Sequence, residues 1–240
     1  MFLNLQGKNI KIKRICVDSR KIKKGDLFLC YKGVNKDGHN YIGQAIKRGA
    51  IAVVGEWPKK DINRLYPNII YKRVPCGRSY WAYLESKFND FPQKGIKFIG
   101  ITGTDGKTTT AHFTYTLLKN AGVKAGLIST LGAFYNDKKV PVPAHTTTPP
   151  PDIIFSLLKE MKKEGIKVVV LEVTSHALEQ KRVYGIPFYS LAITNITPEH
   201  LDMHGNYENY IRAKALSFKQ SKNVYLNKFG EGVSRIKNIY

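Results

Sequence analysis

The chain has few cysteines and no long apolar run. Its 240 residues include three cysteines, Cys16, Cys30 and Cys76, at wide spacing and with no second cysteine or histidine at a metal-ligand interval. We therefore expect reduced thiols rather than a disulfide framework. The apolar stretch at the N-terminus is too short for a signal peptide, and no window approaches the roughly 20 apolar residues of a membrane span. These absences predict a cytoplasmic protein with no membrane span.

Acidic residues are also scarce. Eighteen Asp and Glu residues stand against 39 Lys and Arg residues, which gives a formal net charge of +21. This excess favours an anionic partner, and charge alone leaves nucleic acid, a phosphorylated metabolite and an anionic membrane open. The basic residues are dispersed and no aromatic RNA-binding motif is present, so we expect no nucleic-acid partner. A nucleic-acid binder would lose affinity steeply with salt.

The sequence divides into two parts and contains no internal repeat or low-complexity segment. The first part, residues 1–94, ends in the segment NDFPQKG, which supplies the proline and glycine of a linker. Its expected strands are residues 10–17, 26–31, 51–55 and 69–74, and its expected helices are residues 39–48 and 79–89. We predict a small N-terminal α/β domain that binds substrate.

The second part, residues 95–240, alternates strands with helices, which favours βαβ units on a mainly parallel sheet. Its expected strands are residues 96–102, 125–130, 166–173, 191–196 and 223–226, and its expected helices are residues 107–120, 151–164 and 207–219. The last strand comes just before the sequence stops. The predicted fold class is therefore α/β, with an incomplete central domain of the phosphate-loop type.

The segment FIGITGTDGKTTTAHF at residues 98–113 is typical of a phosphate-binding loop. An expected strand runs into Gly-Thr-Asp-Gly-Lys-Thr and an expected helix follows at once, so backbone N–H groups and the helix N-terminus can meet an anion. The strict pattern G-x-x-x-x-G-K-[ST] is not met, because Ile101 stands five positions before Gly106. A plain tight turn is the alternative. The candidate ATP-binding residues here are Gly103, Thr104, Asp105, Gly106, Lys107, Thr108 and Thr109, with the Thr108 hydroxyl available to Mg²⁺.

Two further strands end in polar residues. VVVLEVTSH at 168–176 brings Glu172 to the end of a buried-type strand, where ligands of parallel α/β sheets bind. Its carboxylate suits a hard cation that bridges phosphates, whereas a solvated surface position is the alternative. The next strand leads into Asn195 and then His200 and His204. The His200-x-x-x-His204 spacing lacks the glutamate of the metalloprotease pattern, which argues against zinc.

Six stretches together resemble the Mur ligases, the ATP-dependent amide-bond-forming enzymes of peptidoglycan synthesis. They are DSRKIKKGDLF at 18–28, GVNKDGHNYIGQAIKRGA at 33–50, ITGTDGKTTT at 101–110, HTTTPP at 145–150, LEVTSHALEQKRV at 171–183 and TNITPEHLDMHGNYENYIRAKALSF at 194–218. The similarity is to the branch that adds the third residue to UDP-N-acetylmuramoyl-L-alanyl-D-glutamate. The phosphate loop alone would also be shared with folylpolyglutamate and cyanophycin synthetases.

The resemblance implies a reaction in which ATP phosphorylates a carboxylate of the UDP-muramyl dipeptide and an amino acid, diaminopimelate or lysine, attacks the acyl phosphate. It assigns catalytic roles to Lys107, Glu172, His200 and Lys214, and nucleotide contact to Asn195. Thr108, Glu172 and His200 would hold Mg²⁺, joined by Lys214 if it is carbamylated. The implied substrate-binding residues are Ser19, Thr147, Thr148, Thr174, Gln180 and Arg182, of which Arg182 offers a planar fork of donors to phosphate or carboxylate.

The C-terminal end departs from the family pattern. Mur ligases continue beyond this point with a third domain that binds the incoming amino acid, and we expect that domain to be absent here. A complementing C-terminal chain is a possible partner. The alternative to a ligase is a truncated non-catalytic module that binds nucleotide or UDP-muramyl peptide.

Overall fold

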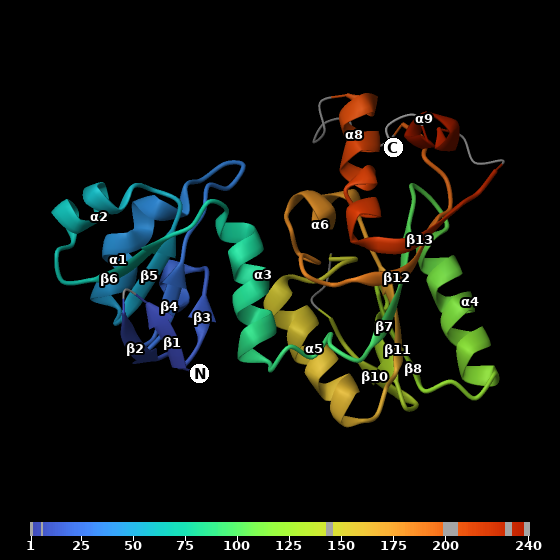
Figure 1. Cartoon of the computed structure of the whole chain (residues 1–240), viewed down its shortest axis with the longest axis horizontal. Helices are drawn as coiled ribbons and strands as arrows, with labels where there is room; N and C mark the ends of the chain where they lie inside the picture. Colours follow the sequence, from blue (N-terminus) through green and yellow to red (C-terminus); the bar gives the residue numbers. More distant parts are fainter. Residues whose placement is uncertain (1, 6, 143–145, 199–205, 229–231, 238–240) are drawn as a thin grey trace. The chain divides into compact units, whose positions relative to one another are not determined.

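The computed structural model describes residues 2–5, 7–142, 146–198, 206–228 and 232–237. The chain forms two compact units, which we call unit 1 (residues 1–88) and unit 2 (residues 89–240). None of the described helices is long and apolar enough to cross a membrane. Both units are α/β, which confirms the expected fold class (Figure 1).

Unit 1 contains a parallel four-stranded sheet and a separate two-stranded hairpin. The sheet has the strand order β3-β4-β5-β6, and the hairpin pairs β1 with β2 antiparallel. The strands are β1 (Phe2–Leu5), β2 (Lys8–Lys11), β3 (Ile15–Cys16), β4 (Leu27–Leu29), β5 (Ala52–Gly55) and β6 (Ile70–Arg73). The helices are η1 (Ser19–Lys21), η2 (Gly38–Tyr41), α1 (Ile42–Lys47), α2 (Lys59–Leu65) and α3 (Gly77–Phe88).

The strand expected at residues 10–17 is two strands, β2 and β3, that belong to different sheets. The chain turns between them because the Lys13 N–H donates to the Gly25 carbonyl and the Arg14 guanidinium pairs with Asp26 at 2.6 Å. These partners lie more than ten residues away in sequence, so the apolar run alone does not show the break. Alternate residues of β4 and β5 face two apolar clusters: Leu27 and Val54 in one, and Phe28 and Val53 in the other.

Unit 2 contains a seven-stranded sheet with the order β10-β9-β8-β11-β7-β12-β13. Strands β8, β11, β7, β12 and β13 are parallel, and β9 and β10 add an antiparallel edge. The strands are β7 (Lys97–Thr102), β8 (Ala125–Ser129), β9 (Gly132–Tyr135), β10 (Lys138–Val140), β11 (Val168–Glu172), β12 (Phe188–Ile193) and β13 (Ser221–Leu226). The five expected strands are therefore all present, with ends shifted by at most three residues.

The helices of unit 2 are α4 (Lys107–Asn120), α5 (Pro151–Lys163), α6 (Ser175–Glu179), α8 (Tyr207–Ala215), η3 (Phe218–Gln220) and α9 (Val233–Lys237). Helices α4 and α5 lie on opposite sides of the sheet (Figure 1). Helix α8 ends four residues earlier than expected, where the Ser217 hydroxyl donates back to the Lys214 carbonyl. The β9–β10 hairpin was not expected; Asn136 and Asp137 form its two-residue turn with φ of 46° and 59°.

Candidate active site

The loop between β7 and α4 holds its shape through glycines at two positions. Gly103 has φ +150°, and a Cβ there would lie 1.9 Å from the Thr194 Oγ1 atom, so a larger residue would have to displace the Thr194 side chain. Gly106 has φ +75° at the N-cap of α4 and would meet nothing within 4 Å. The first glycine is thus required by close approach as well as by its backbone conformation, and the second by backbone conformation alone.

Asn195, just beyond the end of β12, binds the backbone of this loop. Its Oδ1 atom accepts from the Thr104 N–H at 3.1 Å and from the Asp105 N–H at 2.9 Å. The Thr104 hydroxyl in turn accepts from the Thr197 N–H at 3.0 Å and lies 2.9 Å from the Tyr210 hydroxyl. The predicted nucleotide residue Asn195 therefore lies against the predicted loop, where it fixes two backbone amides.

Lys107 is the first residue of α4 and turns back over the loop. Its Nζ atom donates to the Thr104 carbonyl at 2.5 Å. An ammonium in this position places positive charge at the helix N-terminus, where the dipole of α4 already favours an anion. Thr109, two residues further along α4, is exposed to solvent.

Glu172 is the last residue of β11 and only 1% exposed. One carboxylate oxygen accepts from the Thr108 hydroxyl at 2.8 Å, and the other accepts from the Thr130 N–H and hydroxyl at 3.0 and 3.2 Å. Among the residues that the structure describes, no lysine, arginine or histidine lies within ion-pair distance of this carboxylate. A buried carboxylate without a cation is costly, so this arrangement favours a bound cation.

The donor set around Glu172 fits Mg²⁺. Carboxylate and hydroxyl oxygens are the ligands that a hard divalent cation prefers, and Thr108 and Glu172 present both kinds beside a loop shaped for phosphate. Among the described residues no three His, Cys, Asp or Glu side chains form a group of the kind that could hold a metal ion by themselves. An ion here would therefore take its remaining ligands from phosphate oxygens and water. His200 and His204 lie outside the described residues, so neither role considered for them is tested.

Lys214 on α8 reaches the loop from the other side. Its Nζ atom donates to the Gly103 carbonyl at 2.7 Å and lies 4.5 Å from the centre of the Tyr210 ring. The residue is 1% exposed. Nothing in the sequence spacing indicates this position, because α8 follows the loop by about a hundred residues; the family resemblance alone pointed to it.

Three threonines connect the strand ends beside Glu172. The Thr148 hydroxyl is fully buried, donates to the Glu172 carbonyl at 2.9 Å and accepts from the Thr174 N–H at 3.1 Å. Thr174 caps α6 by accepting from the Ala177 N–H. The Thr147 and Thr130 hydroxyl oxygens lie 3.0 Å apart. Thr147 is thus linked to Glu172 through Thr130, whereas Thr148 and Thr174 support the end of β11.

Gln180 and Arg182 lie together after α6. The Gln180 side-chain oxygen accepts from the Arg182 Nε and Nη2 atoms at 3.1 and 2.8 Å, and Arg182 Nη1 donates to the Thr148 carbonyl at 2.7 Å. These bonds orient the guanidinium and tie it to the threonine segment. The sequence-predicted substrate residues of unit 2 are therefore brought together around one corner of the sheet.

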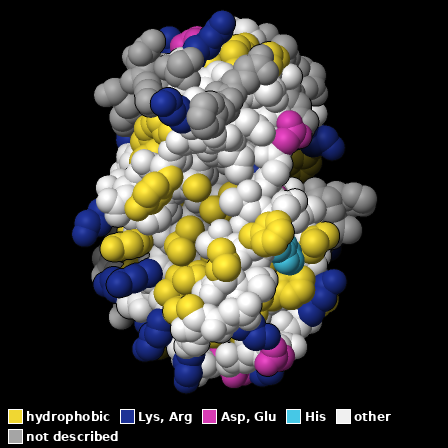
Figure 2. Space-filling model, turned by 90° about the vertical axis from the view of Figure 1, so that its right-hand side faces the viewer, with side chains coloured by type: hydrophobic (Ala, Val, Ile, Leu, Met, Phe, Trp, Pro, Cys, Tyr) yellow, Lys and Arg dark blue, Asp and Glu magenta, His cyan; other side chains and the backbone are white. Residues whose placement is uncertain are grey.

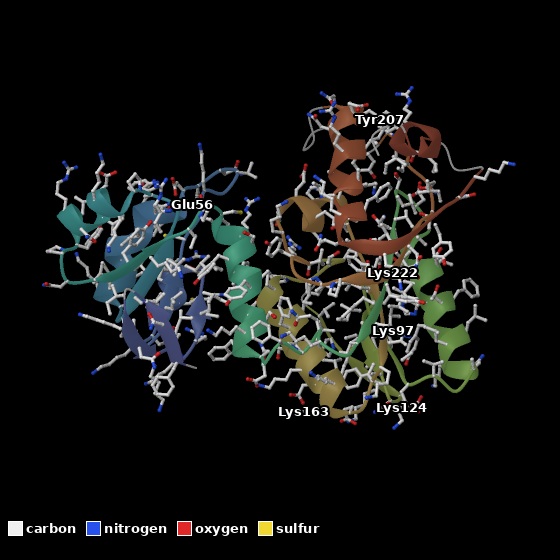
Figure 3. The ribbon with its side chains drawn as sticks, viewed as in Figure 1. Glu56, Lys97, Lys124, Lys163, Tyr207 and Lys222 are labelled. Carbon is white, nitrogen blue, oxygen red and sulfur yellow. The ribbon has the colours of Figure 1, made fainter. Side chains whose placement is uncertain are left out.

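A pocket of about 500 Å³ lies beside the loop, on the side of β12 and β13. It is lined by the loop residues Asp105 and Gly106, by Thr110 of α4, and by residues 192–195 and 225–227. Its volume is in the range that holds a drug-sized ligand. Phe113 and Leu117 of α4 are 67% and 69% exposed. Hydrophobic side chains gather on the face of the molecule that Figure 2 shows. Lys124, just before β8, and Lys163, at the end of α5, lie at the end of the unit 2 strands opposite the phosphate loop (Figure 3).

Ser19 belongs to unit 1, where it lines a separate pocket of about 360 Å³. Its hydroxyl donates to the Gln44 side-chain oxygen at 2.6 Å. Asp18 and Arg20 also line this pocket and bind each other; hydrogen bonding from Arg20 lowers the pKa of Asp18 to about 2. Glu56, labelled in Figure 3, follows β5 and accepts from the Gly77 N–H at the start of α3 at 2.7 Å.

Comparison with known proteins agrees with the resemblance inferred from the motifs. Residues 101–228 match the Mur ligase middle domain, and residues 11–80 match the Mur ligase family catalytic domain. The chain belongs to the Mur ligase family. It is 40% identical over 229 residues to UDP-N-acetylmuramoyl-L-alanyl-D-glutamate–2,6-diaminopimelate ligase 1 of Clostridium acetobutylicum and 41% identical over 220 residues to the corresponding ligase of Geobacillus thermodenitrificans.

The matches cover most of this Mur ligase chain but less than half of its relatives. They span 94% of the chain and 46% of the C. acetobutylicum protein, and 92% and 43% for the G. thermodenitrificans protein. A solved structure of a diaminopimelate ligase has the same fold, with a TM-score of 0.76 at 22% identity over 96% of this chain and 46% of that one. MurF ligase from Thermotoga maritima in complex with ADP follows with a TM-score of 0.56 and 24% identity, over 92% and 47%.

Thr130 and Tyr210 belong to this Mur ligase site but were not predicted from the sequence. Thr130 binds Glu172 directly, and its position just after β8 could have indicated it, because the ends of parallel strands meet at one edge. Tyr210 contacts both Thr104 and Lys214. Its spacing of four residues from Lys214 puts both on one face of α8, a signal that becomes useful only once Lys214 is known.

Proposed function

We propose that this chain is the nucleotide-binding and UDP-substrate-binding part of an ATP-dependent amide ligase that adds diaminopimelate to UDP-N-acetylmuramoyl-L-alanyl-D-glutamate. The observation that carries the proposal is the buried Glu172 carboxylate, without a cationic partner among the described residues, hydrogen-bonded to Thr108 at the start of the loop helix. The relatives that are 39–41% identical are named as diaminopimelate ligases, and this supports the substrate assignment.

The nucleotide would bind along the edge formed by β7 and β12. The backbone amides at the start of α4, from Gly106 onward, would receive the phosphates, because Asn195 already binds those of Thr104 and Asp105. The Lys107 ammonium would turn from the Thr104 carbonyl to the terminal phosphate. The pocket lined by Thr110 and Tyr225 would receive the base. The T. maritima MurF ligase, which shares this fold, was solved in complex with ADP, and this supports a nucleotide-binding role for the chain.

Thr108 and Glu172 would hold Mg²⁺, and a bound Mg²⁺ would neutralise the charge that develops on the transferred phosphate. With the ion bound, the Thr108 hydroxyl would no longer donate to Glu172. The Thr108 Oγ1 and Glu172 Oε1 atoms would then both be available to the ion. Thr130 would keep the carboxylate oriented through its two bonds. The Lys214 amine donates to the Gly103 carbonyl and so holds the loop. The carbamylation of Lys214 stays a prediction, as does the role of His200.

The carboxylate end of the UDP-muramyl dipeptide, which is the acyl donor, would lie between the threonine segment and the Arg182 guanidinium. Thr147 is linked to the Glu172 carboxylate through Thr130, and Arg182 is already oriented by Gln180 and the Thr148 carbonyl. The uridine end would enter the separate unit 1 pocket, where the Ser19 hydroxyl can exchange Gln44 for a ligand atom. The dipeptide carboxylate would first take the γ-phosphoryl group of ATP and release ADP, because an unactivated carboxylate is a poor electrophile. The amine would then attack the acyl carbon, with loss of inorganic phosphate and of a proton from nitrogen.

The test is calorimetric titration of the chain with ADP, with and without Mg²⁺. We expect binding that Mg²⁺ strengthens, a loss of at least tenfold in Lys107→Ala, and in Glu172→Gln retention of ADP binding without the Mg²⁺ effect. The exposed Lys119→Ala, on the same helix, is the matched control and should bind as the parent does. Equal ADP affinity in the parent and in Lys107→Ala would refute the proposed site.

Ligase activity is tested separately, since the relatives that define it are more than twice as long. The chain is incubated with ATP, Mg²⁺, UDP-N-acetylmuramoyl-L-alanyl-D-glutamate and diaminopimelate or lysine, and the tripeptide is sought by mass spectrometry. Product that disappears in Lys107→Ala would establish a ligase. Binding of both substrates without product would favour the alternative, a non-catalytic binding module or one half of a two-chain enzyme.

A further inference from the structure

Unit 1 carries a strongly basic surface at the edge of its sheet where the parallel strands begin. Six exposed cationic side chains gather there from three segments far apart in sequence: Lys11, Lys13, Lys23, Lys24, Lys47 and Arg48. We call this surface the basic edge. It contains no carboxylate, because the segments 11–13, 22–25 and 46–50 have no Asp or Glu.

Backbone contacts hold these segments side by side. The Lys13 N–H donates to the Gly25 carbonyl, and the Gly25 N–H donates to the Gly49 carbonyl. The Lys13 side chain passes over Gly25, where an added Cβ would lie 2.8 Å from its Cδ atom, and a Cβ on Gly49 would lie 2.9 Å from the Lys24 Cα atom. The clustering of charge is therefore a product of the fold and not of one basic run in the sequence.

The carboxylates nearest in sequence do not neutralise the basic edge. Residues 1–55 contain three acidic side chains, and each is already bound: Asp18 to Arg20, Asp26 to Arg14 and Asp37 to His39. The six lysine and arginine side chains therefore project their charge into solvent. Holding so many like charges together is unfavourable unless an anionic partner offsets their repulsion.

The basic edge is also separate from the unit 1 pocket. That pocket is lined by Val17, Cys30 and Tyr31, which follow the ends of β3 and β4, whereas the basic edge precedes the starts of β3, β4 and β5. A ligand in the pocket would leave these charges unpaired. The partner of the basic edge must then be something other than the proposed UDP substrate.

An exposed aromatic ring extends the basic edge. Phe2 of β1 is 61% exposed and pairs with the exposed Lys11 of β2, so the ring and this ammonium lie on the same exposed face of the hairpin. Side chains that combine several ammonium groups with one apolar ring suit the interface of an anionic bilayer, where headgroups meet the charges and the ring enters the boundary with the acyl chains. Neither the unit 1 pocket nor the pocket beside the unit 2 loop lies at this edge.

We propose that the basic edge of unit 1 binds anionic membrane surfaces reversibly, with Phe2 as its apolar contact. The proposal is independent of the ligase activity and of the site in unit 2. It predicts attachment that is weak, salt-sensitive and dependent on lipid charge, because a single aromatic side chain and a modest set of lysines fall short of a stable anchor.

The test is co-sedimentation of the whole chain with phosphatidylcholine vesicles that contain or lack phosphatidylglycerol. We expect binding only to the anionic vesicles, reduced by added salt. Lys13→Gln/Lys24→Gln/Lys47→Gln should lower the affinity by roughly 100-fold, at about fivefold for each cation near an anionic surface. Phe2→Ser should lower it by about tenfold. The control, Lys59→Gln/Lys60→Gln/Arg64→Gln, removes the same charge from α2 of the same unit and should bind as the parent does.

Three results would overturn the proposal. One is equal sedimentation with neutral and anionic vesicles, and another is an equal loss in the control and in the basic-edge variant. The third is tighter binding to single-stranded or duplex DNA, measured by fluorescence anisotropy, that Phe2→Ser leaves unchanged; this would make the basic edge a nucleic-acid surface. Phe2→Ser keeps every charge and lies on the hairpin surface, so it remains informative even if the triple variant does not fold.

Discussion

The two units use polar side chains in different ways. In unit 2 the polar residues at the strand ends bind one another: Asn195 fixes the loop amides, Thr148 joins the Glu172 and Thr174 backbones, and Lys214 closes on Gly103. In unit 1 the pocket residue Ser19 has a single partner, Gln44, on an exposed helix position. Unit 2 is therefore organised before any ligand arrives, whereas unit 1 has more to reorganise, and the cost of a substitution should differ accordingly.

The largest expected effect comes from the tightest point of the unit 2 loop. Gly103→Ala places a Cβ 1.9 Å from the Thr194 Oγ1 atom and should lower the free energy of unfolding by about 3 kcal/mol and abolish ADP binding. Gly106→Ala meets nothing within 4 Å and should cost only about 1 kcal/mol, for its φ of +75°. Urea denaturation of both variants measures the difference. Equal costs would mean that the loop is free to move away from Thr194.

The next effect tests the threonine segment of unit 2. Thr148→Val removes a fully buried hydroxyl that donates to the Glu172 carbonyl and accepts from the Thr174 N–H, and should lower the free energy of unfolding by about 2 kcal/mol. Thr109→Val, on the exposed start of α4, is the control and should change it by less than about 0.5 kcal/mol. A Thr148→Val protein as stable as the control would show that this buried bond is replaceable.

These contacts also explain which parts of the site could be predicted from the sequence. The phosphate loop and Glu172 follow local rules, since each stands where a strand of a parallel sheet ends, and the expected strands and helix α4 formed. The hydrogen bonds between them join residues that are far apart in sequence: Thr104 and Asn195 are separated by 91 positions, and Gly103 and Lys214 by 111. Hydrophobic periodicity does not indicate contacts between residues so far apart in sequence. The break between β2 and β3 was missed for the same reason, because Gly25 and Asp26 cause it.

A smaller effect is expected in unit 1. Ser19→Ala removes one hydrogen bond, to Gln44, and should lower the free energy of unfolding by at most about 1 kcal/mol. The loss in the free energy of binding uridine diphosphate should exceed the loss in the free energy of unfolding, because Ser19 lines the pocket. Thermal denaturation and calorimetry separate the two readouts. A stability loss as large as that of Thr148→Val would erase the contrast between the units.

The smallest effect concerns acid stability in unit 1. Hydrogen bonding from Arg20 lowers the pKa of Asp18 from its ordinary 3.8 to about 2, so the folded state holds the ionised carboxylate more tightly than the unfolded chain does. The resulting stabilisation is present in full above pH 4 and is lost as the pH falls toward 2. Because Arg20 is exposed and solvent screens the pair, the contribution is small. In Asp18→Asn, the melting temperature should decline less steeply than in the parent over this interval, with the two curves parallel above it; curves that stay parallel throughout would show that Asp18 and Arg20 do not pair in solution.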